Sequence, residues 1–307
     1  MEWKGTGNFC CTQISNKQSL LMKKASIISK QGKPELGKVV VQVAGWLRDH
    51  GYAITADAAT REFCPDCEPA EREELANVAP DFVIVLGGDG TLLSTARCVA
   101  RADIPILGVN LGSLGFLTEV KQEEIEQALE EVDAGRCCEL SLRPMLHCQV
   151  QREGKCVATH DALNEVVMNQ SAVARITDFE LRVNGIFVAN YKADGLIIST
   201  PTGSTAYSLA AGGPILSPDV SGFVITPVAS HALTNRPLVV KDTAIIEARI
   251  LVTREQAFLT VDGQVGTPLV ENDLVICKKS EYNVKLFKFA GRSFFDVLRT
   301  KLKWGER

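Results

Sequence analysis

The feature that most constrains this chain is the apolar run Phe82–Leu86, which is followed at once by Gly-Gly-Asp-Gly-Thr at residues 87–91. A short run without polar alternation is typical of a strand that is covered on both faces in a parallel sheet. Glycines then let the chain turn sharply, and the residues from about Leu92 to Ala102 have helical character. This succession predicts an α/β domain whose ligands bind at the carboxyl ends of its strands.

The rest of the first half repeats the alternation of strands and helices. Further strands are expected at Ala25–Ile28, Tyr52–Ala56 and Ile104–Val109, and further helices from Pro34, in a first turn where proline is favoured, and over Glu123–Val132. The segment Asp57–Pro69 is rich in proline, cysteine and acids, and we expect a mobile loop there. A Rossmann-like domain is therefore predicted at residues 24–142, after a flexible tail at residues 1–23.

The second half has the pattern of a mainly antiparallel β domain. Glu-Gly at residues 153–154, Asn-Gly at 184–185 and Asp-Gly at 262–263 predict three hairpins, because such pairs adopt the positive φ angles of tight turns. The expected strands are Ala162–Met168, Phe179–Val183, Ile186–Tyr191, Leu196–Thr200, Ala244–Leu251, Ala257–Val261 and Leu274–Lys278. We place this domain at residues 143–291, with the boundary near Leu140–Arg143. A C-terminal helix within residues 292–307, with Phe295, Leu298 and Leu302 on one side, is expected to pack back on the first domain.

The composition suits a globular protein and argues against two classes of partner. Of 307 residues, 46% are hydrophobic, and the formal net charge is −4 with acids and bases mixed along the chain. A basic stripe for nucleic acid is missing, and no apolar run approaches the roughly 18 residues of a membrane helix. The stretch Met1–Lys24 is polar and lacks the apolar segment of a secretory signal. We therefore expect a cytoplasmic protein that binds neither nucleic acid nor membranes.

Ten cysteines raise the question of disulfides or metal binding. Cys64 and Cys67 have the C-x-x-C spacing that can hold zinc or perform redox chemistry. A four-ligand zinc site needs a second pair, and none has suitable spacing; a chain of this length also builds a core without disulfides. The favoured interpretation is a surface loop with reduced thiols, and no permanent metal site is expected.

Asp89 lies in the middle of the glycine turn, where the helix begins. Glycines let a phosphate or ribose approach the backbone, and a helix N-terminus offers free N–H groups to anions. A carboxylate repels phosphate unless it binds a metal or takes up a proton, so Asp89 is a candidate general base or metal ligand. The alternative is a tight turn that happens to carry an aspartate. No Gly-Lys-Ser/Thr follows, as a P-loop requires, and Leu93 replaces the third glycine of a dinucleotide-binding fingerprint.

A second concentration of polar groups lies at residues 193–210, Ala-Asp-Gly-Leu-Ile-Ile-Ser-Thr-Pro-Thr-Gly-Ser-Thr-Ala-Tyr-Ser-Leu-Ala. A strand is broken at Pro201, and Ser204 or Thr205 then caps a helix that ends near Gly212. The hydroxyls, free N–H groups and aromatic ring of this turn suit the sugar and phosphates of a nucleotide. The alternative is a well-capped short helix with no ligand.

Asn164 and Glu165 interrupt an apolar strand. Taken alone, this pattern favours two polar side chains that face solvent on alternate sides of the strand. The functional alternative is that they hold hydroxyls or a base edge.

Together these segments resemble the bacterial-type NAD kinase (ATP-NAD kinase) family. The resemblance runs from about Ala25 to the C-terminus and includes residues 110–117, Asn-Leu-Gly-Ser-Leu-Gly-Phe-Leu, and residues 231–237, His-Ala-Leu-Thr-Asn-Arg-Pro. The Gly-Gly-Asp-Gly-Thr turn is shared with lipid kinases and, loosely, with phosphofructokinases, whereas Thr-Pro-Thr-Gly-Ser-Thr-Ala-Tyr is much more specific. Ser230 departs from the family, because many relatives have proline there.

The resemblance implies a dinucleotide site between an α/β domain and a β domain. Asp89 matches the family's catalytic acid–base residue, with Gly90 beside it, and Asn164 and Glu165 match its Asn-Glu pair. Further contacts to NAD are implied for Arg175, Lys192, Asp194, Thr202, Thr205, Ala206, Tyr207, Ser208, Leu209, Ala210 and Gln264.

The resemblance also implies the reaction. A phosphoryl group passes from ATP or another donor to the 2′-hydroxyl of the adenosine ribose of NAD and gives NADP, with Mg²⁺ or Mn²⁺ on the donor and Asp89 as general base. Family members form dimers and tetramers, so a homodimer or homotetramer is expected. The alternatives are a lipid or sugar kinase that shares the glycine turn and a non-catalytic NAD(P) sensor. Residues 193–210 argue against the first, and the intact Asp89 argues against the second.

Overall fold

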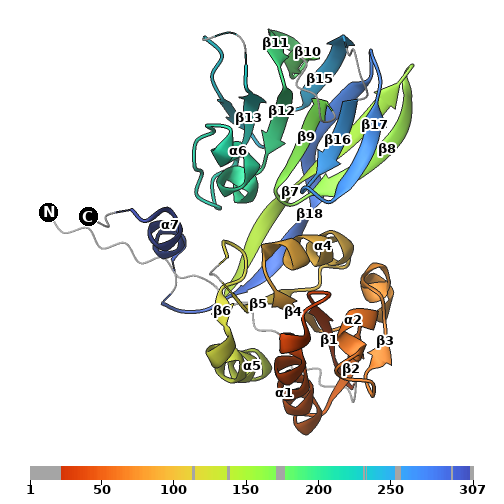
Figure 1. The fold of residues 1–307 in the computed structure, drawn as a ribbon, viewed down its shortest axis with the longest axis vertical. Helices are drawn as coiled ribbons and strands as arrows, with labels where there is room; N and C mark the ends of the chain where they lie inside the picture. The colour runs from red at the N-terminus through yellow and green to blue at the C-terminus, as the bar shows by residue number, and fades with distance from the viewer. Residues whose placement is uncertain are drawn as a thin grey trace, which may run out of the picture.

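The computed structural model describes residues 22–112, 115–136, 139–170, 177–230, 232, 234–252, 257–291 and 293–304. These residues form two parts that are joined by two long strands (Figure 1). The first part contains helices and parallel strands, and the second consists almost entirely of antiparallel strands. The predicted fold class is therefore confirmed.

The first part is built on a parallel sheet with the order β3-β2-β1-β4-β5. Its strands are β1 (Lys23–Ser29), β2 (Tyr52–Ala56), β3 (Glu68–Pro69), β4 (Phe82–Gly87), β5 (Ile106–Asn110) and β6 (Val120–Lys121). Its helical segments are η1 (Pro34–Leu36), α1 (Gly37–Asp49), α2 (Ala58–Arg61), η2 (Arg72–Glu74), α3 (Leu75–Val78), α4 (Asp89–Val99), η3 (Ala100–Ala102), η4 (Gln122–Glu124) and α5 (Ile125–Asp133). The strand order reverses between β1 and β4, and such a switch point is where ligands bind in α/β sheets.

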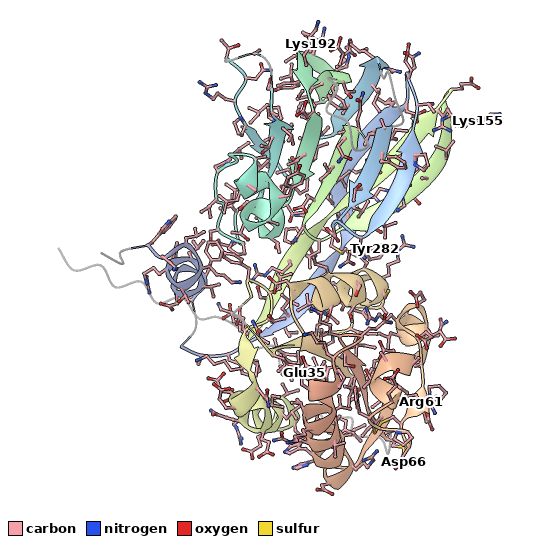
Figure 2. All side chains as sticks on the ribbon, viewed as in Figure 1. Glu35, Arg61, Asp66, Lys155, Lys192 and Tyr282 are labelled. Atoms are coloured by element: carbon pink, nitrogen blue, oxygen red, sulfur yellow. A yellow bond between two sulfur atoms is a disulfide. The ribbon has the colours of Figure 1, made fainter. Side chains whose placement is uncertain are left out.

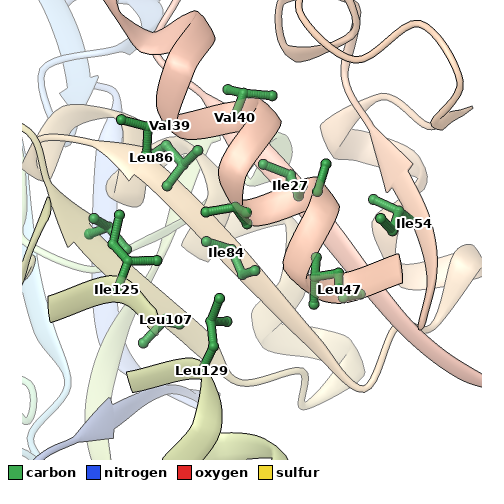
Figure 3. Packing of buried hydrophobic residues seen from close by; sticks show 14 of the residues in the cluster. Ile27, Val39, Val40, Leu47, Ile54, Ile84, Leu86, Leu107, Ile125 and Leu129 are labelled. Carbon is green, nitrogen blue, oxygen red and sulfur yellow. The ribbon is translucent and has the colours of Figure 1, made fainter. Parts of the chain in front are cut away.

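Helices cover both faces of this sheet, which explains why β4 is apolar along its whole length. Successive side chains of a strand point to opposite faces. Ile84 and Leu86 belong to the core beneath α1 and α5, where Figure 3 shows Leu47 and Ile125 around them. Val83 and its alternate neighbours belong to the core beneath α3 and α4. This double burial fixes the end of β4, and therefore the glycine turn, in place.

Two long strands, β7 (Glu139–Arg152) and β18 (Leu274–Lys288), connect the two parts (Figure 1). They pair antiparallel with each other, and β18 also pairs with β5 in the first part and with β15 (Ile246–Val252) in the second. One twelve-stranded sheet therefore runs through both parts. The expected boundary near Leu140–Arg143 falls inside β7, and the division at residues 142 and 143 stays a prediction.

The second part adds a six-stranded antiparallel sheet with the order β14-β13-β12-β9-β16-β17. Its strands are β9 (Glu165–Gln170), β12 (Gly195–Ser199), β13 (Gly222–Val228), β14 (Leu238–Lys241), β16 (Ala257–Val261) and β17 (Val265–Leu269). The long sheet contributes β8 (Lys155–Ala162), β10 (Thr177–Val183) and β11 (Ile186–Ala193). A core that contains Phe179 and Phe223 lies between the two sheets. The three predicted hairpins are confirmed, since Glu153, Asn184 and Asp262 have φ of 49°, 52° and 48° and each precedes a glycine of positive φ.

The expectation of a mobile loop at Asp57–Pro69 is wrong. Asp57 caps α2 by accepting the N–H of Thr60, and the segment ends in β3, which pairs with β2. Cys64 and Cys67 are disulfide-bonded and buried, so the expectation of exposed reduced thiols is also wrong. The polar composition suggested a solvated loop, but a cap and a covalent link give the segment a definite structure.

Two other expectations need correction. The strand predicted at Ala162–Met168 is broken, because β8 ends at Ala162 and β9 begins at Glu165. Helix α7 (Phe294–Leu302) lies within the range predicted for the C-terminal helix and is capped by Ser293, but Phe295 is 59% exposed and only Leu298 of the expected apolar face is buried. Within the described ranges, no helix is long and apolar enough to cross a membrane.

Candidate active site

The glycine turn at residues 87–91 lies at the carboxyl end of β4 and begins α4. A Cβ on Gly87 would stand 2.8 Å from Thr91 Oγ1, so the turn needs glycine there. An open cavity of about 420 Å³ lies beside the turn, lined by Lys30, Gln31, Arg72, Gly88, Gly90, Thr91, Ser94 and Gln264. Two cationic side chains and the N-terminus of α4 make this cavity suitable for an anion such as phosphate.

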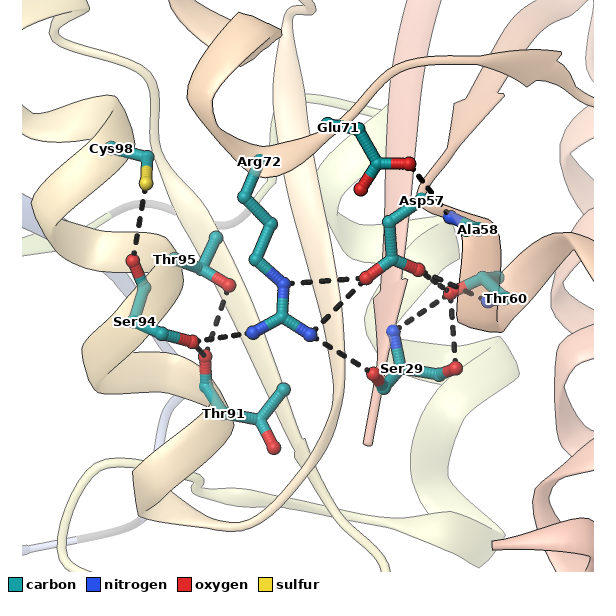
Figure 4. A network of polar contacts seen from close by, with 10 residues as sticks. All are labelled: Ser29, Asp57, Ala58, Thr60, Glu71, Arg72, Thr91, Ser94, Thr95 and Cys98. Carbon is teal, nitrogen blue, oxygen red and sulfur yellow. Dashed lines mark hydrogen bonds and ion pairs between the residues drawn. The ribbon is translucent and has the colours of Figure 1, made fainter. Parts of the chain in front are cut away.

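Arg72 is held at this cavity by the polar network in Figure 4. Its guanidinium lies 3.1 Å from the carboxylate of Asp57 and donates hydrogen bonds to Ser94 Oγ (2.6 Å) and to the carbonyl of Ser29 (3.3 Å). Our sequence interpretation missed Arg72, because no local pattern indicates contacts with residues that are 15 to 43 positions away. Arg72 is therefore an additional candidate for the phosphate side of the site.

Asp89 is half-buried at the first position of α4. Its carboxylate accepts hydrogen bonds from the backbone N–H groups of Phe116 (3.0 Å) and Leu117 (3.2 Å) and from the hydroxyl of Thr118 (3.3 Å). A Cβ on Gly115 would lie 2.1 Å from Asp89 Oδ1, so the loop after β5 approaches closely only because it carries glycine. These contacts fix the orientation of the Asp89 carboxylate without any ligand.

In the second part, two turns pack against each other at the ends of β9 and β12. The backbone N–H of Thr200 donates to the carbonyl of Asn164 (2.9 Å), and the Thr200 hydroxyl donates to the carbonyl of Leu163 (2.6 Å). A Cβ on Gly203 would lie 2.1 Å from the carbonyl oxygen of Asn164. The glycine inside the Thr-Pro-Thr-Gly-Ser-Thr sequence therefore allows the two turns to touch.

Three side-chain oxygens at this junction are buried and have no hydrogen-bond partner. They are Asn164 Oδ1, Glu165 Oε2 and Thr202 Oγ1. Asn164 is 9% exposed and Glu165 is 6% exposed, so the expectation that these two face solvent is wrong. A buried polar atom without a partner costs about 1–3 kcal/mol. Unpaired oxygens gathered on adjacent turns indicate a place where a ligand supplies the missing hydrogen-bond partners.

Glu165 has an unusual protonation equilibrium. Burial raises its pKa to about 8, and the nearby carboxylate of Asp262 raises it further in the same direction, while the backbone N–H of Tyr207 opposes the shift. At neutral pH, Glu165 is therefore mainly protonated in the free protein. A ligand that donates hydrogen bonds to it would favour the ionised form.

Direct contacts join the two halves of the site. The side-chain amide of Gln264 donates to the carbonyl of Gly90 (2.7 Å), and Arg97 of α4 lies 2.9 Å from the carboxylate of Asp262. Asp262 in turn accepts the backbone N–H of Asn164 at 2.8 Å. The fold thus brings the glycine turn and the Asn164–Glu165 turn to the same interface.

The helix expected after Pro201 exists but is shorter and starts differently. Thr202–Thr205 form η5 and Tyr207–Ala210 form α6, and neither segment has a side-chain cap. Instead of capping, Ser204 Oγ accepts the N–H of Leu216 (2.6 Å). Ser208 is buried and hydrogen-bonds to Thr226, whereas the ring of Tyr207 is 43% exposed. This helix leaves Tyr207 available to a ligand.

Lys192 and Asp194 lie at a different place from the other candidate residues. Both precede β12, whereas Thr202 follows it. Five residues of strand at about 3.3 Å each separate the two ends by roughly 17 Å. In Figure 2, Tyr282 lies near the junction with the first part, whereas Lys192 lies at the opposite end of the second part. Arg175 lies outside the described residues.

Comparisons with known proteins agree with this architecture. The sequence model of the ATP-NAD kinase N-terminal domain matches residues 26–137, and that of the ATP-NAD kinase C-terminal domain matches residues 163–289. Among curated relatives, the NAD kinase of Koribacter versatilis is 52% identical over 93% of this chain and 100% of its own length. The NAD kinase of Acidobacterium capsulatum is 48% identical over the same shares.

Two solved structures share the fold. The yeast NADH kinase in complex with NADH has a TM-score of 0.86 at 23% identity, over 93% of this chain and 89% of its own. The Archaeoglobus fulgidus NAD kinase in complex with ATP has a TM-score of 0.73 at 27% identity, over 90% of this chain and 99% of its own. With the family sequence models and near-complete relatives in agreement, the chain belongs to the ATP-NAD kinase family and is a phosphotransferase that acts on NAD.

Proposed function

We propose that this enzyme transfers the terminal phosphoryl group of ATP to the 2′-hydroxyl of the adenosine ribose of NAD, with the reaction centred on Asp89. The observation that carries the proposal is the set of unpaired buried oxygens on Asn164, Glu165 and Thr202. Ribose hydroxyls both donate and accept hydrogen bonds, and they suit a surface where an amide oxygen, a carboxyl oxygen and a hydroxyl lack partners. This surface is joined to the glycine turn through Gln264.

The donor's phosphates would bind in the cavity beside the glycine turn. Glycines give the phosphates access to the backbone N–H groups at the start of α4, and Lys30 and Arg72 supply positive charge. Ser94 and Asp57 already hold the guanidinium of Arg72, so little side-chain entropy is lost when phosphate binds. Positioning and charge neutralisation of this kind dominate phosphoryl transfer.

A divalent cation fits this site only as a companion of the donor. Among the residues that the structure describes, no group of three or more His, Cys, Asp and Glu side chains could hold a metal ion by itself. At the turn, the carboxylate of Asp89 and the hydroxyl of Thr91 are hard oxygen ligands, which suits Mg²⁺ or Mn²⁺ held mainly by phosphate. Such an ion, when bound, neutralises charge on the phosphates.

Asp89 would accept the proton of the attacking 2′-hydroxyl. Its carboxylate is oriented by Phe116, Leu117 and Thr118, so no reorganisation of the base is needed when substrates arrive. General base catalysis of this kind contributes about 10²- to 10⁴-fold in rate. Asn164 and Glu165 would hold ribose hydroxyls, so they bind the acceptor without taking the proton.

The proposal extends to the other residues that the family resemblance implied. Thr202, Thr205 and the helix Tyr207–Ala210 would line the NAD site, with the exposed ring of Tyr207 available for stacking. Lys192, Asp194 and Arg175 are proposed as ligand contacts on the family resemblance alone. The same resemblance is the basis for proposing a homodimer or homotetramer, and the composition of the sequence is the basis for proposing that it acts in the cytoplasm.

The test is product formation by the purified protein with NAD, Mg²⁺ and either ATP or polyphosphate. The proposal expects NADP, and it expects Asp89→Asn to lower turnover by about 10²- to 10⁴-fold. Wild-type turnover in that variant would refute the role of Asp89. If no donor yields NADP, phosphorylation of lipid and sugar acceptors and binding of NAD are measured next. Binding of NAD without turnover would indicate a sensor.

A further inference from the structure

We infer that Arg97 is a positioning residue that holds the two halves of the site in register: it orients the Asn164–Glu165 turn through Asp262 and the Gly90 carbonyl through Gln264. The inference rests on the proposed function, because it assumes that the two turns act on the two substrates. Arg97 does not line the cavity beside the glycine turn, and it acts on the site through Asp262 and Gln264. Its role would be to set the geometry between the two turns.

The first half of this arrangement is the carboxylate of Asp262. Its oxygens accept the backbone N–H groups of Leu163 (3.2 Å), Asn164 (2.8 Å) and Glu165 (3.2 Å). The backbone N–H of Asp262 donates back to the carbonyl of Glu165 (3.0 Å). The Asn164–Glu165 turn, which carries the proposed contacts with NAD, is therefore held in place by hydrogen bonds to one carboxylate.

That carboxylate depends on Arg97 for its charge partner. The side chain of Asp262 is completely buried, and the guanidinium of Arg97, 16% exposed, lies 2.9 Å from it. A buried carboxylate that keeps its backbone N–H donors but loses the guanidinium of Arg97 is less favourable, because removal of one member of a buried ion pair leaves the other uncompensated. Loss of Arg97 should therefore disturb Asp262 and, through it, the backbone of the Asn164–Glu165 turn.

The second half of the arrangement runs to the glycine turn. The other terminal nitrogen of Arg97 donates to Gln264 Oε1 (2.6 Å), and Gln264 Nε2 donates to the carbonyl of Gly90 (2.7 Å). The oxygen and the nitrogen of the Gln264 side-chain amide thus both form hydrogen bonds from the second part to the first part of the protein. The planar fork of Arg97 reaches Asp262 and Gln264 at once, which a lysine with its single ammonium group does not reproduce.

The chain offers a matched control one helical turn further on. Arg101 of η3 lies 3.1 Å from Asp161 of β8 and so makes a second ion pair between the same two parts. Its side chain is 63% exposed, and Asp161 bonds to His147 and Ser280 rather than to the Asn164–Glu165 turn. Removing Arg101 therefore weakens the interface without disturbing the proposed site.

The experiment compares Arg97→Met with Arg101→Met in the full chain, by NAD affinity, kcat and thermal unfolding. Because a misplacement of about 1 Å can cost roughly 10²-fold in rate, we expect Arg97→Met to lose about 10- to 100-fold in kcat and to bind NAD more weakly. Arg101→Met should stay within about 2-fold of wild type in both quantities. Equal kinetics in the two folded variants would overturn the inference.

Arg97→Lys separates positioning from folding. Lysine keeps the ion pair with Asp262 but loses the simultaneous contact with Gln264. We expect NAD affinity within about 3-fold of wild type and a kcat lowered by about 10-fold; wild-type kcat would contradict the inference. If Arg97→Met does not fold, the kcat of Arg97→Lys is sufficient to test the inference. Failure of the proposed function is distinguishable, because the wild-type chain itself would then produce no NADP.

Discussion

The two halves of the site use their polar groups in opposite ways. At the glycine turn, Asp89 already receives three hydrogen bonds and Arg72 already donates to three partners, next to an open cavity. At the junction of the second part, the oxygens of Asn164, Glu165 and Thr202 are buried and unpaired. The first half is organised before any ligand arrives, whereas the second leaves buried oxygens whose hydrogen bonds a ligand can complete. The difference supports our proposal that the chemistry takes place at the first half and that the acceptor binds at the second.

The largest effect is expected where the two turns of the second half come closest together, at Gly203 and Asn164. Gly203→Ala places a Cβ about 2.1 Å from the carbonyl oxygen of Asn164, and because that atom belongs to the backbone, it moves only if the whole turn moves. We expect a loss of about 1–3 kcal/mol in folding free energy and, because the two turns must separate, NAD affinity reduced more than about 100-fold. Calorimetric titration and thermal unfolding measure the two effects.

Gly45→Ala is the control for that substitution. Gly45 lies inside α1, and a Cβ there meets nothing within 4 Å. Alanine should stabilise the helix by about 0.8–1 kcal/mol without changing NAD affinity. If Gly203→Ala binds NAD as well as Gly45→Ala does, the two turns do not form the acceptor site.

A smaller effect is expected from one unpaired oxygen. Thr202→Val removes a buried hydroxyl that has no partner, so the free protein should be as stable as wild type or more stable. NAD should bind more weakly by roughly 2- to 10-fold, the value of one hydrogen bond. Unfolding and binding measured on the same preparation separate the two results.

Thr55→Val is the control, because it removes a buried hydroxyl that has a hydrogen-bond partner and lies away from the site. Thr55 Oγ1 is hydrogen-bonded to Ser26 Oγ at 2.6 Å in the first part. Its loss should cost about 1–3 kcal/mol of stability and leave NAD affinity unchanged. A destabilised Thr202→Val with normal NAD affinity would remove the contrast between the two halves.

The smallest effect is the pH dependence caused by Glu165. Its pKa is about 8 in the folded protein against 4.5 ordinarily, so between these values the folded state holds a proton that the unfolded state has lost. The resulting stability is fully present below about pH 4.5 and is lost as pH rises through 8. Relative to Glu165→Gln, the wild type should lose on the order of 1 kcal/mol between pH 7 and pH 9. A difference between the two proteins that is constant over this range would contradict the burial of the Glu165 carboxyl.

Local patterns in the sequence were enough to predict the elements that form within a few residues. The run Phe82–Leu86 predicted a doubly buried strand because both faces must be apolar, and the Asp-Gly pair at residues 262–263 predicted a hairpin because only such residues adopt its φ angles. The glycine turn with Asp89 followed from the same reasoning. For Asn164 and Glu165, the local pattern alone favoured side chains that face solvent, and the family resemblance favoured a role in binding.

Contacts between distant residues were not predictable in this way. Arg97 and Asp262 are 165 positions apart, and each looks like an ordinary charged surface residue in its own segment. The break at Asn164 was hidden inside an apolar run, because the hydrogen bonds that create it come from Asp262 and Thr200. Similarly, nothing local showed that Cys64 and Cys67 would be buried. These features depend on contacts between segments that lie far apart in the sequence.

The most direct test of the division between the two halves is the affinity of Asp89→Asn for NAD, measured by calorimetric titration without a phosphoryl donor. Asparagine keeps the size of the side chain and removes the base, at the cost of at least one hydrogen bond from Phe116, Leu117 or Thr118, while the unpaired oxygens on the second half are untouched. The account predicts a dissociation constant within about 3-fold of wild type. An affinity that falls as far as turnover does would show that Asp89 binds the acceptor itself and that the two halves are not separate.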